Sequence, residues 1–203
     1  MKTTLLTALL LAFLAFPPRA RAEDCVAKTI MDQAYTEILQ VVTTATDDES
    51  MRTSVRTIMA RFIDFTEFGS LSMGSHWAAL TVPQRDLYLV EFKELLKRTY
   101  LRRFERGKKF VVTYRSGCRM NSTGDRLEIQ TVIHSADDVE ADVDYRFHKT
   151  VSGWLVYDIV VDEVSVMRNY RKTFVETYEK EGFDRLIEKM RSKKSDRDED
   201  DAR

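Results

Sequence analysis

Three histidines are the side chains in this sequence best suited to bind a metal ion or to move a proton near neutral pH. They are His76, His134 and His148, which lie far apart and do not have the spacing of a metal site such as His-Glu-x-x-His. The sequence also has no glycine-rich phosphate loop and no Gly-x-Ser-x-Gly turn for a nucleophilic serine. We therefore expect neither a metal site nor a cofactor.

Two carboxylates offer another route to acid–base chemistry. Asp158 and Asp162 lie within or beside an apolar stretch from Trp154 to Val161. A buried carboxyl group has a raised pKa, and with a tyrosine such as Tyr145 as the acid it could act as a general base. A carboxylate at a strand end more often pairs with an arginine, because structural ion pairs are common. We favour that structural role, and an isomerase or hydrolase-like enzyme stays an alternative.

The two cysteines, Cys25 and Cys118, have no histidine near them in the sequence that would favour a nucleophile. In an oxidising compartment they could form a disulfide, which would stabilise the fold by up to about 4 to 5 kcal/mol in the chain-entropy treatment. The sequence gives no geometry for the pair. A disulfide and two free thiols therefore both remain open.

The first 22 residues have the pattern of a cleaved export signal. Lys2 precedes an apolar run from Leu5 to Phe16, and Ala20-Arg21-Ala22 places small residues around a cleavage point. The run is too short to cross a bilayer, although a retained membrane anchor is the alternative. Without this segment the chain would have 29 basic and 33 acidic residues, a net charge of −4. Such a balance argues against a nucleic-acid partner.

The remaining composition predicts one folded domain over residues 23–190. Hydrophobic residues make up 43% of the sequence and charged residues 32%, with seven Gly and three Pro, which excludes collagen-like and globally disordered classes. Residues 191–203 are charged, and Ala202 is the only apolar residue among them. We expect this segment to form a disordered tail.

The spacing of apolar residues divides the domain into helices and strands. Helical spacing predicts helices from Asp24 to about Val42, from Met51 to about Phe62, and from Pro83 to about Arg106. A period of two then predicts four strands, at 110–115, 127–134, 139–148 and 154–161. Ser165 is the expected N-cap of a returning helix, and a short helix follows from Phe183 to about Met190.

These elements predict an α+β fold. Helices come first, then a curved four-stranded antiparallel meander sheet, and then C-terminal helices that return over the sheet. Strands of this length must twist or curl. The expected shape is a cone like that of nuclear transport factors, whose interior can be either packed or hollow.

Two sequence motifs stand out in the predicted domain. The first is a Tyr-Asp-aliphatic strand, an acidic turn, a serine and then Asn-Tyr-Arg-x-x-Phe, found here from Val156 to Phe174. The second combines Gly74-x-x-Trp77, Thr81-x-x-Gln84-Arg85, Phe92-x-x-Leu95-Leu96 and Thr99-Tyr100. Together they resemble the motifs of the MlaC family, also called toluene-tolerance auxiliary proteins. One difference is the turn Asp162-Glu163, where many relatives have Glu-Gly.

The resemblance implies a periplasmic carrier that binds phospholipid and has no enzymatic activity. Members of the family are soluble shuttles between an outer-membrane lipoprotein complex and an inner-membrane ABC transporter with a substrate-binding ring subunit. They contribute to outer-membrane lipid asymmetry. We expect a monomer, and a hopanoid-type or other lipid is an alternative ligand.

The candidate lipid contacts are apolar residues that the pattern places inside the cone, because acyl chains offer nothing to hydrogen-bond. The alternative is that these residues simply pack against each other. The candidates are Phe92, Leu96, Tyr100, Val112, Ile129, Val143, Tyr145, Val156, Val160, Val164, Tyr170 and Phe174.

Overall fold

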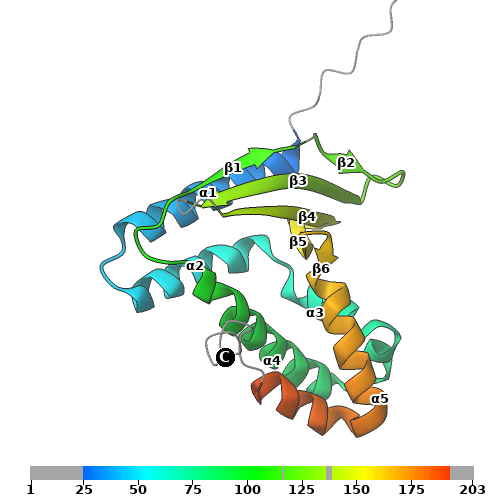
Figure 1. The fold of residues 1–203 in the computed structure, drawn as a ribbon. Coiled ribbons are helices and arrows are strands. Elements are labelled where there is room, and N and C mark those ends of the chain that lie inside the picture. Colours follow the sequence, from blue (N-terminus) through cyan, green and yellow to red (C-terminus); the bar gives the residue numbers. More distant parts are fainter. Residues whose placement is uncertain (1–24, 116, 136–138, 193–203) are drawn as a thin grey trace, which may run out of the picture.

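A computed structural model describes residues 25–115, 117–135 and 139–192, and it confirms the α+β fold. Most helices precede a sheet and one long helix follows it (Figure 1). The helices are α1 (Val26–Thr44), α2 (Asp48–Phe62), α3 (Phe65–Met73), α4 (Val82–Tyr100) and α5 (Val166–Ser192), with short 3-10 helices η1 (Gly74–Ala79) and η2 (Leu101–Arg103). The predicted signal at 1–22 and residues 193–203 of the predicted tail lie outside the described residues.

The sheet is antiparallel throughout and is slightly larger than expected. Its strands are β1 (Phe110–Tyr114), β2 (Arg119–Met120), β3 (Arg126–Ser135), β4 (Glu140–Thr150), β5 (Gly153–Val161) and β6 (Val164–Ser165). They are ordered β1-β3-β4-β5-β6, and β2 pairs with β3. The four long strands are those that the sequence predicts. The other two have two residues each, which is too short to produce a period in the sequence.

A tight turn connects β5 to β6. Asp162 and Glu163 form it with φ angles of 46° and 67°, both in the left-handed region. Two-residue hairpin turns require such angles, and glycine adopts them most easily. Asp162 compensates in part, because its Oδ1 atom accepts a hydrogen bond of 3.1 Å from the backbone N–H of Asp142.

Side-chain caps fix where the helices begin. Thr81 and Gln84 form a capping box at the start of α4. Ser165 caps α5 as predicted, since its Oγ accepts a hydrogen bond of 3.0 Å from the N–H of Arg168. The predicted short final helix is the second half of α5, which follows a break at Gly182, where φ is 83°. Across the described residues, no helix is both long and apolar enough to cross a membrane.

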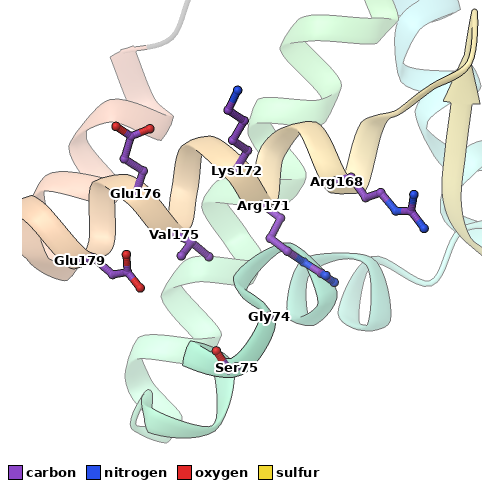
Figure 2. Close-up of a pocket in the computed structure, with 8 residues that line it drawn as sticks. All are labelled: Gly74, Ser75, Arg168, Arg171, Lys172, Val175, Glu176 and Glu179. Carbon is purple, nitrogen blue, oxygen red and sulfur yellow. The ribbon is translucent and has the colours of Figure 1, made fainter.

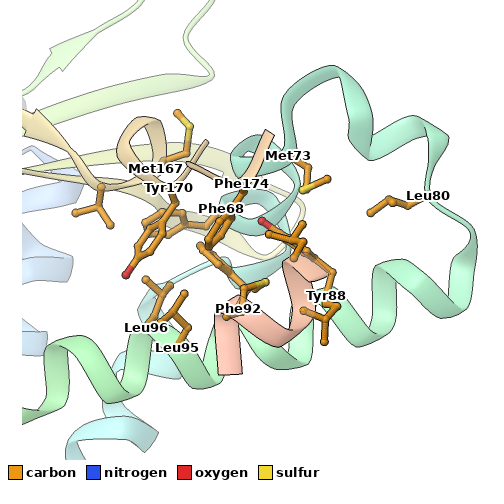
Figure 3. Packing of buried hydrophobic residues seen from close by; sticks show 14 residues of the cluster. Phe68, Met73, Leu80, Tyr88, Phe92, Leu95, Leu96, Met167, Tyr170 and Phe174 are labelled. Carbon is orange, nitrogen blue, oxygen red and sulfur yellow. The ribbon is translucent and has the colours of Figure 1, made fainter. Parts of the chain in front are cut away.

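Helices α3, α4 and α5 pack into a solid cluster, which we call the packed end (Figure 3). Aromatic rings fill its centre, with ring centroids 5.5 Å apart for Phe68 and Phe92 and 5.1 Å apart for Tyr170 and Phe174. The buried members are Phe68, Met73, Leu80, Tyr88, Phe92, Leu95, Leu96, Val166, Met167, Tyr170, Phe174, Leu186, Ile187 and Met190.

Candidate functional site

A cavity of about 650 Å³ lies between one face of the sheet and helices α1, α2 and α4. This volume falls within the range of about 300 to 1,000 Å³ that is typical of small-molecule sites. Most of its lining is apolar. The apolar and aromatic lining residues are Met31, Ala34, Tyr35, Ile38, Val42, Met59, Phe62, Ile63, Phe65, Phe68, Leu96, Tyr100, Leu101, Phe104, Phe110, Ile133, Val139, Ala141, Val143, Tyr145, Val156, Ile159, Val161 and Val166.

The register of the sheet determines which side chains face this cavity. In β4 the residues Val143 and Tyr145 face it, and they pair with Val161 and Ile159 of β5. A bulge then shifts the register, so that Phe147 pairs with Val156. The extra residue places Val156 on the cavity face together with Ile159 and Val161.

Five of the twelve candidate residues line the cavity. They are Leu96, Tyr100, Val143, Tyr145 and Val156. They come from α4, β4 and β5, so the structure brings together residues up to 60 positions apart in the sequence. These five are the candidates that stand where a ligand in the cavity would meet them.

The other seven candidates do not line the cavity. Phe92, Tyr170 and Phe174 are buried in the packed end. Ile129 faces the same side of the sheet but is covered by Ala27 and Met31 of α1, and Val112 shares that face through its pairing with Ile133. Val160 lies on the opposite face because of the β5 bulge. Val164 is 57% exposed in β6.

The sequence pattern missed the contribution of the N-terminal helices and of the loop before β1. Helix α1 lines the cavity with one stripe, at Met31, Ala34, Tyr35, Ile38 and Val42. The helical spacing of apolar residues in α1 was the available signal, since it shows that this stripe faces inward. It does not show whether that stripe meets other side chains or an empty space.

Two tyrosines, Tyr35 of α1 and Tyr145 of β4, place hydrogen-bonded hydroxyl groups on the cavity wall. The Tyr35 hydroxyl donates a hydrogen bond of 2.7 Å to the Tyr145 hydroxyl. Burial raises the pKa of Tyr35 to about 12 despite its hydrogen bonds to Tyr145 and Thr131. Burial, together with the nearby Tyr35, also raises the pKa of Tyr145 well above its ordinary value. Both side chains are therefore neutral at physiological pH, and they add no charge to the apolar wall.

Asp158 is wholly buried, but it lies on the other face of the sheet. It pairs in register with Arg146, whose guanidinium donates to its Oδ2 at 2.9 Å. Ser165 Oγ donates to the same oxygen at 2.7 Å, and the Met167 N–H donates to Oδ1 at 3.0 Å. Asp158 thus has the structural role that we favoured, and the sheet separates it from Tyr145, so the two do not form an acid–base pair.

Each histidine lies beside one carboxylate in a different part of the fold. His76 is 2.9 Å from Glu179, His148 is 3.0 Å from Asp64, and His134 is 3.6 Å from Glu140. Within the described part of the chain, no three His, Cys, Asp or Glu side chains are placed to hold a metal ion together.

The structure joins Cys25 and Cys118 in a disulfide, with a Cα–Cα distance of 5.6 Å. Cys25 immediately precedes α1, and Cys118 immediately precedes β2. The bond therefore attaches the start of a helix that lines the cavity to the edge of the sheet.

Comparison with known proteins identifies the family. The family model described as "MlaC protein" matches residues 29–192, which include every described helix and strand except the first three residues of α1. The chain belongs to the MlaC family. The match covers both motifs found in the sequence.

Two proteins similar to this MlaC chain are named for phospholipid transport or binding. The intermembrane phospholipid transport system binding protein MlaC of Haemophilus influenzae is 25% identical over 200 residues, covering 95% of this chain and 92% of the relative. A phospholipid-binding protein from Ralstonia solanacearum, solved in complex with a phospholipid, has a TM-score of 0.73 at 21% identity. It covers 81% of this chain and 94% of its own. The similarity to the Ralstonia solanacearum structure shows that the two chains share a fold.

The MlaC motif residues on α5 hold the packed end together. Tyr170 and Phe174 are part of its aromatic cluster, and Arg171 donates from Nε to the carbonyl oxygen of Leu71 at 2.6 Å. Figure 2 shows Arg171 extending from α5 towards the segment that contains Gly74. A Cβ atom at Gly74 would lie 3.6 Å from the Arg171 side chain, and φ there is 57°. A shallow polar pocket surrounds this contact, and the motif thus serves the fold.

Proposed function

We propose that this chain binds the acyl chains of a phospholipid in the cavity and carries the lipid through the periplasm. The observation that supports this most directly is the apolar cavity of about 650 Å³ in a chain of the MlaC family. The names of the two relatives, one a phospholipid transport system binding protein and the other a phospholipid-binding protein, support the same ligand class.

The proposed role is solvation and transfer, without a covalent step. Two acyl chains with about thirty methylenes would gain ~24 kcal/mol on leaving water at ~0.8 kcal/mol each. This exceeds the practical ceiling of ~18 to 21 kcal/mol for non-covalent affinity. The relevant reference is therefore a bilayer, where the chains are already buried. A carrier needs only to match the bilayer approximately, so that lipid can both enter and leave.

The direction of transport must then come from partners. In this proposal the carrier exchanges lipid with an outer-membrane lipoprotein complex and with an inner-membrane ABC transporter that has a substrate-binding ring subunit. ATP hydrolysis by the transporter would supply the free energy that an equilibrated carrier lacks. The expected export signal at the start of the sequence is consistent with this location.

Native mass spectrometry of protein exported to the periplasm tests the ligand. We expect phospholipid to co-purify with the wild-type protein. Val143→Trp places a large ring inside the cavity and should reduce or remove the bound lipid while leaving circular dichroism close to that of the wild type, since Val143 is a cavity-lining residue of a central strand.

Val164→Trp is the matched control, because it makes the same substitution at a position that is 57% exposed outside the cavity. It should keep the wild-type lipid content. A wild-type protein without lipid would contradict the proposal, and unchanged lipid content in Val143→Trp would place the ligand elsewhere. The mass of the released molecule distinguishes phospholipid from a hopanoid.

A further inference from the structure

Six basic side chains lie along the opening of the cavity, and we call them the basic rim. Four are exposed to solvent and two on α4 are half-buried, so they stand where the cavity meets water. Glu105 is the one acidic residue among the described residues that line the cavity. The basic rim consists of Arg56, Lys93, Lys97, Arg102, Lys108 and Lys109.

Carboxylates neutralise only part of this rim. Lys97 pairs with Glu94, and Lys108 pairs with Glu105 at 2.8 Å. Among the described residues, no carboxylate lies within ion-pair distance of Arg56, Lys93 or Lys109. These three come from α2, α4 and the segment before β1, so their charges reach the opening from three directions.

The excess of positive charge is local. The whole sequence has 32 basic and 33 acidic residues, so its overall charge does not account for a rim of one sign. Lys93 also rests over the aromatic ring of Phe65, with Nζ 5.3 Å from the ring centroid. Because Phe65 lines the cavity, this contact holds a cation at the border between the apolar wall and solvent.

From this arrangement we infer that the carrier selects phospholipids whose headgroup has a net negative charge, such as phosphatidylglycerol, over zwitterionic ones. The inference rests on the proposed function, because the headgroup reaches the rim only when acyl chains fill the cavity. A zwitterionic headgroup adds an ammonium group that the three cations repel, whereas phosphatidylglycerol adds no positive charge. Coulomb attraction therefore distinguishes the two headgroups even when their acyl chains are identical.

Equilibrium loading from mixed vesicles tests this selectivity. The purified chain is incubated with vesicles that contain equal amounts of phosphatidylglycerol and phosphatidylethanolamine with the same deuterated acyl chains, and is then separated from them. Mass spectrometry gives the ratio of the two lipids on the protein. Attraction of the rim to the vesicle surface speeds loading of both lipids, whereas contact with the headgroup changes their ratio at equilibrium.

We expect the wild-type ratio to favour phosphatidylglycerol at least about threefold, as several partly exposed charge interactions would give. This ratio should decrease when the salt concentration rises from about 0.05 M to about 0.5 M, because salt shortens the distance over which charges attract each other. The triple variant Arg56→Gln, Lys93→Gln, Lys109→Gln should bring the ratio close to one. A control triple variant, Lys149→Gln, Arg168→Gln, Lys172→Gln, removes one arginine and two lysines outside the cavity and should keep the wild-type ratio.

The total amount of lipid bound per protein distinguishes a failure of this inference from a failure of the proposed function. An equal ratio on a fully loaded wild-type protein would overturn headgroup selection and leave the carrier function intact. A selective wild type whose ratio is unchanged in the rim variant would also overturn the role of these residues. A protein that takes up neither lipid would contradict the carrier function itself, and with it this inference.

Discussion

The packed end and the cavity are built from the same kinds of residue but differ in what fills them. In the packed end, aromatic rings from three helices contact each other. The ring centroid of Phe92 lies within 6.2 Å of the centroids of four other rings. Around the cavity, α1, α2 and the sheet present side chains of the same apolar types to an open space. The helix α4 serves both regions, since Phe92 is in the packed end and Tyr100 lines the cavity.

This difference explains how a hollow protein keeps its shape. A cavity forfeits the dispersion contacts that its lining would otherwise make. The packed end, the sheet hydrogen bonds and the Cys25–Cys118 disulfide hold the walls in place without help from the interior of the cavity. Stability and ligand binding therefore depend largely on different residues. A substitution in one region should change one of these properties more than the other.

The largest expected effect is the loss of stability when the packed end loses an aromatic ring. Phe92→Ala should lower the free energy of unfolding by about 3 to 5 kcal/mol, because Phe92 is fully buried and its removal leaves a new void. Ile133→Ala, at the cavity wall, should cost only about 1 kcal/mol in lipid-free protein, because its side chain already borders empty space. Urea denaturation of both variants measures the difference. Equal losses would mean that the cavity wall is as tightly packed as the core.

The sequence largely predicted which side chains point inward. It did not predict whether an inward side chain contacts other side chains or borders the cavity. The periods of two and 3.6 identified the four long strands and the inward stripe of α4. They could not distinguish Phe92 from Tyr100, because both lie on the same stripe of one helix. Whether a stripe meets another helix or an open space depends on how the elements diverge in three dimensions.

Local irregularities account for other differences. The pattern placed Val156 and Val160 on one face, since they are four residues apart in a strand. The bulge in β5 adds one residue between them and reverses the facing of every residue that follows, so Val160 turns away from the cavity. The hairpin at Asp162-Glu163 likewise carries Val164 to the surface, and no apolar period marks either feature.

The second effect concerns the covalent link between the two walls of the cavity. Replacing both Cys25 and Cys118 by Ser should lower the free energy of unfolding by about 2 to 5 kcal/mol, because the disulfide closes a loop between residues 93 positions apart. The wild type treated with reductant should lose a similar amount. Urea denaturation under oxidising and reducing conditions gives both values.

The same cysteine variants test how far the cavity depends on that link. The disulfide holds the start of α1 against the sheet, and Cys25 and Cys118 pack beside the cluster that contains Ala27 and Leu127. We expect the folded variant to retain lipid, since the residues that line the cavity lie further along α1. Loss of lipid from a variant that remains folded would show that the disulfide shapes the cavity as well as stabilising it.

The smallest effect concerns the outer face of the sheet, opposite the cavity. Partial burial raises the pKa of Glu128, but hydrogen bonds and charge from Arg146 and Arg119 outweigh it, so the pKa lies below its ordinary value of 4.5. Because the folded state favours the ionised form, this stabilisation is complete above pH 4.5 and is lost as the pH falls through the lowered pKa. Glu128→Gln should therefore be slightly less stable than the wild type at pH 7, and the difference should narrow at acidic pH.

Chemical denaturation of the wild type and Glu128→Gln across this pH range measures the effect on stability. The amount of lipid bound to each protein shows whether the change also affects the cavity face of the sheet. Glu128 alternates with Leu127 and Ile129, so its side chain points away from the cavity, and lipid content should be the same in both proteins at every pH where they are folded. Tyr35 and Tyr145 on the cavity wall stay neutral in this range, because the ordinary tyrosine pKa already lies far above it and burial raises the pKa of both further. A change in lipid content that follows the ionisation of Glu128 would show that the two faces of the sheet are coupled, and the division between stability and binding would then not hold.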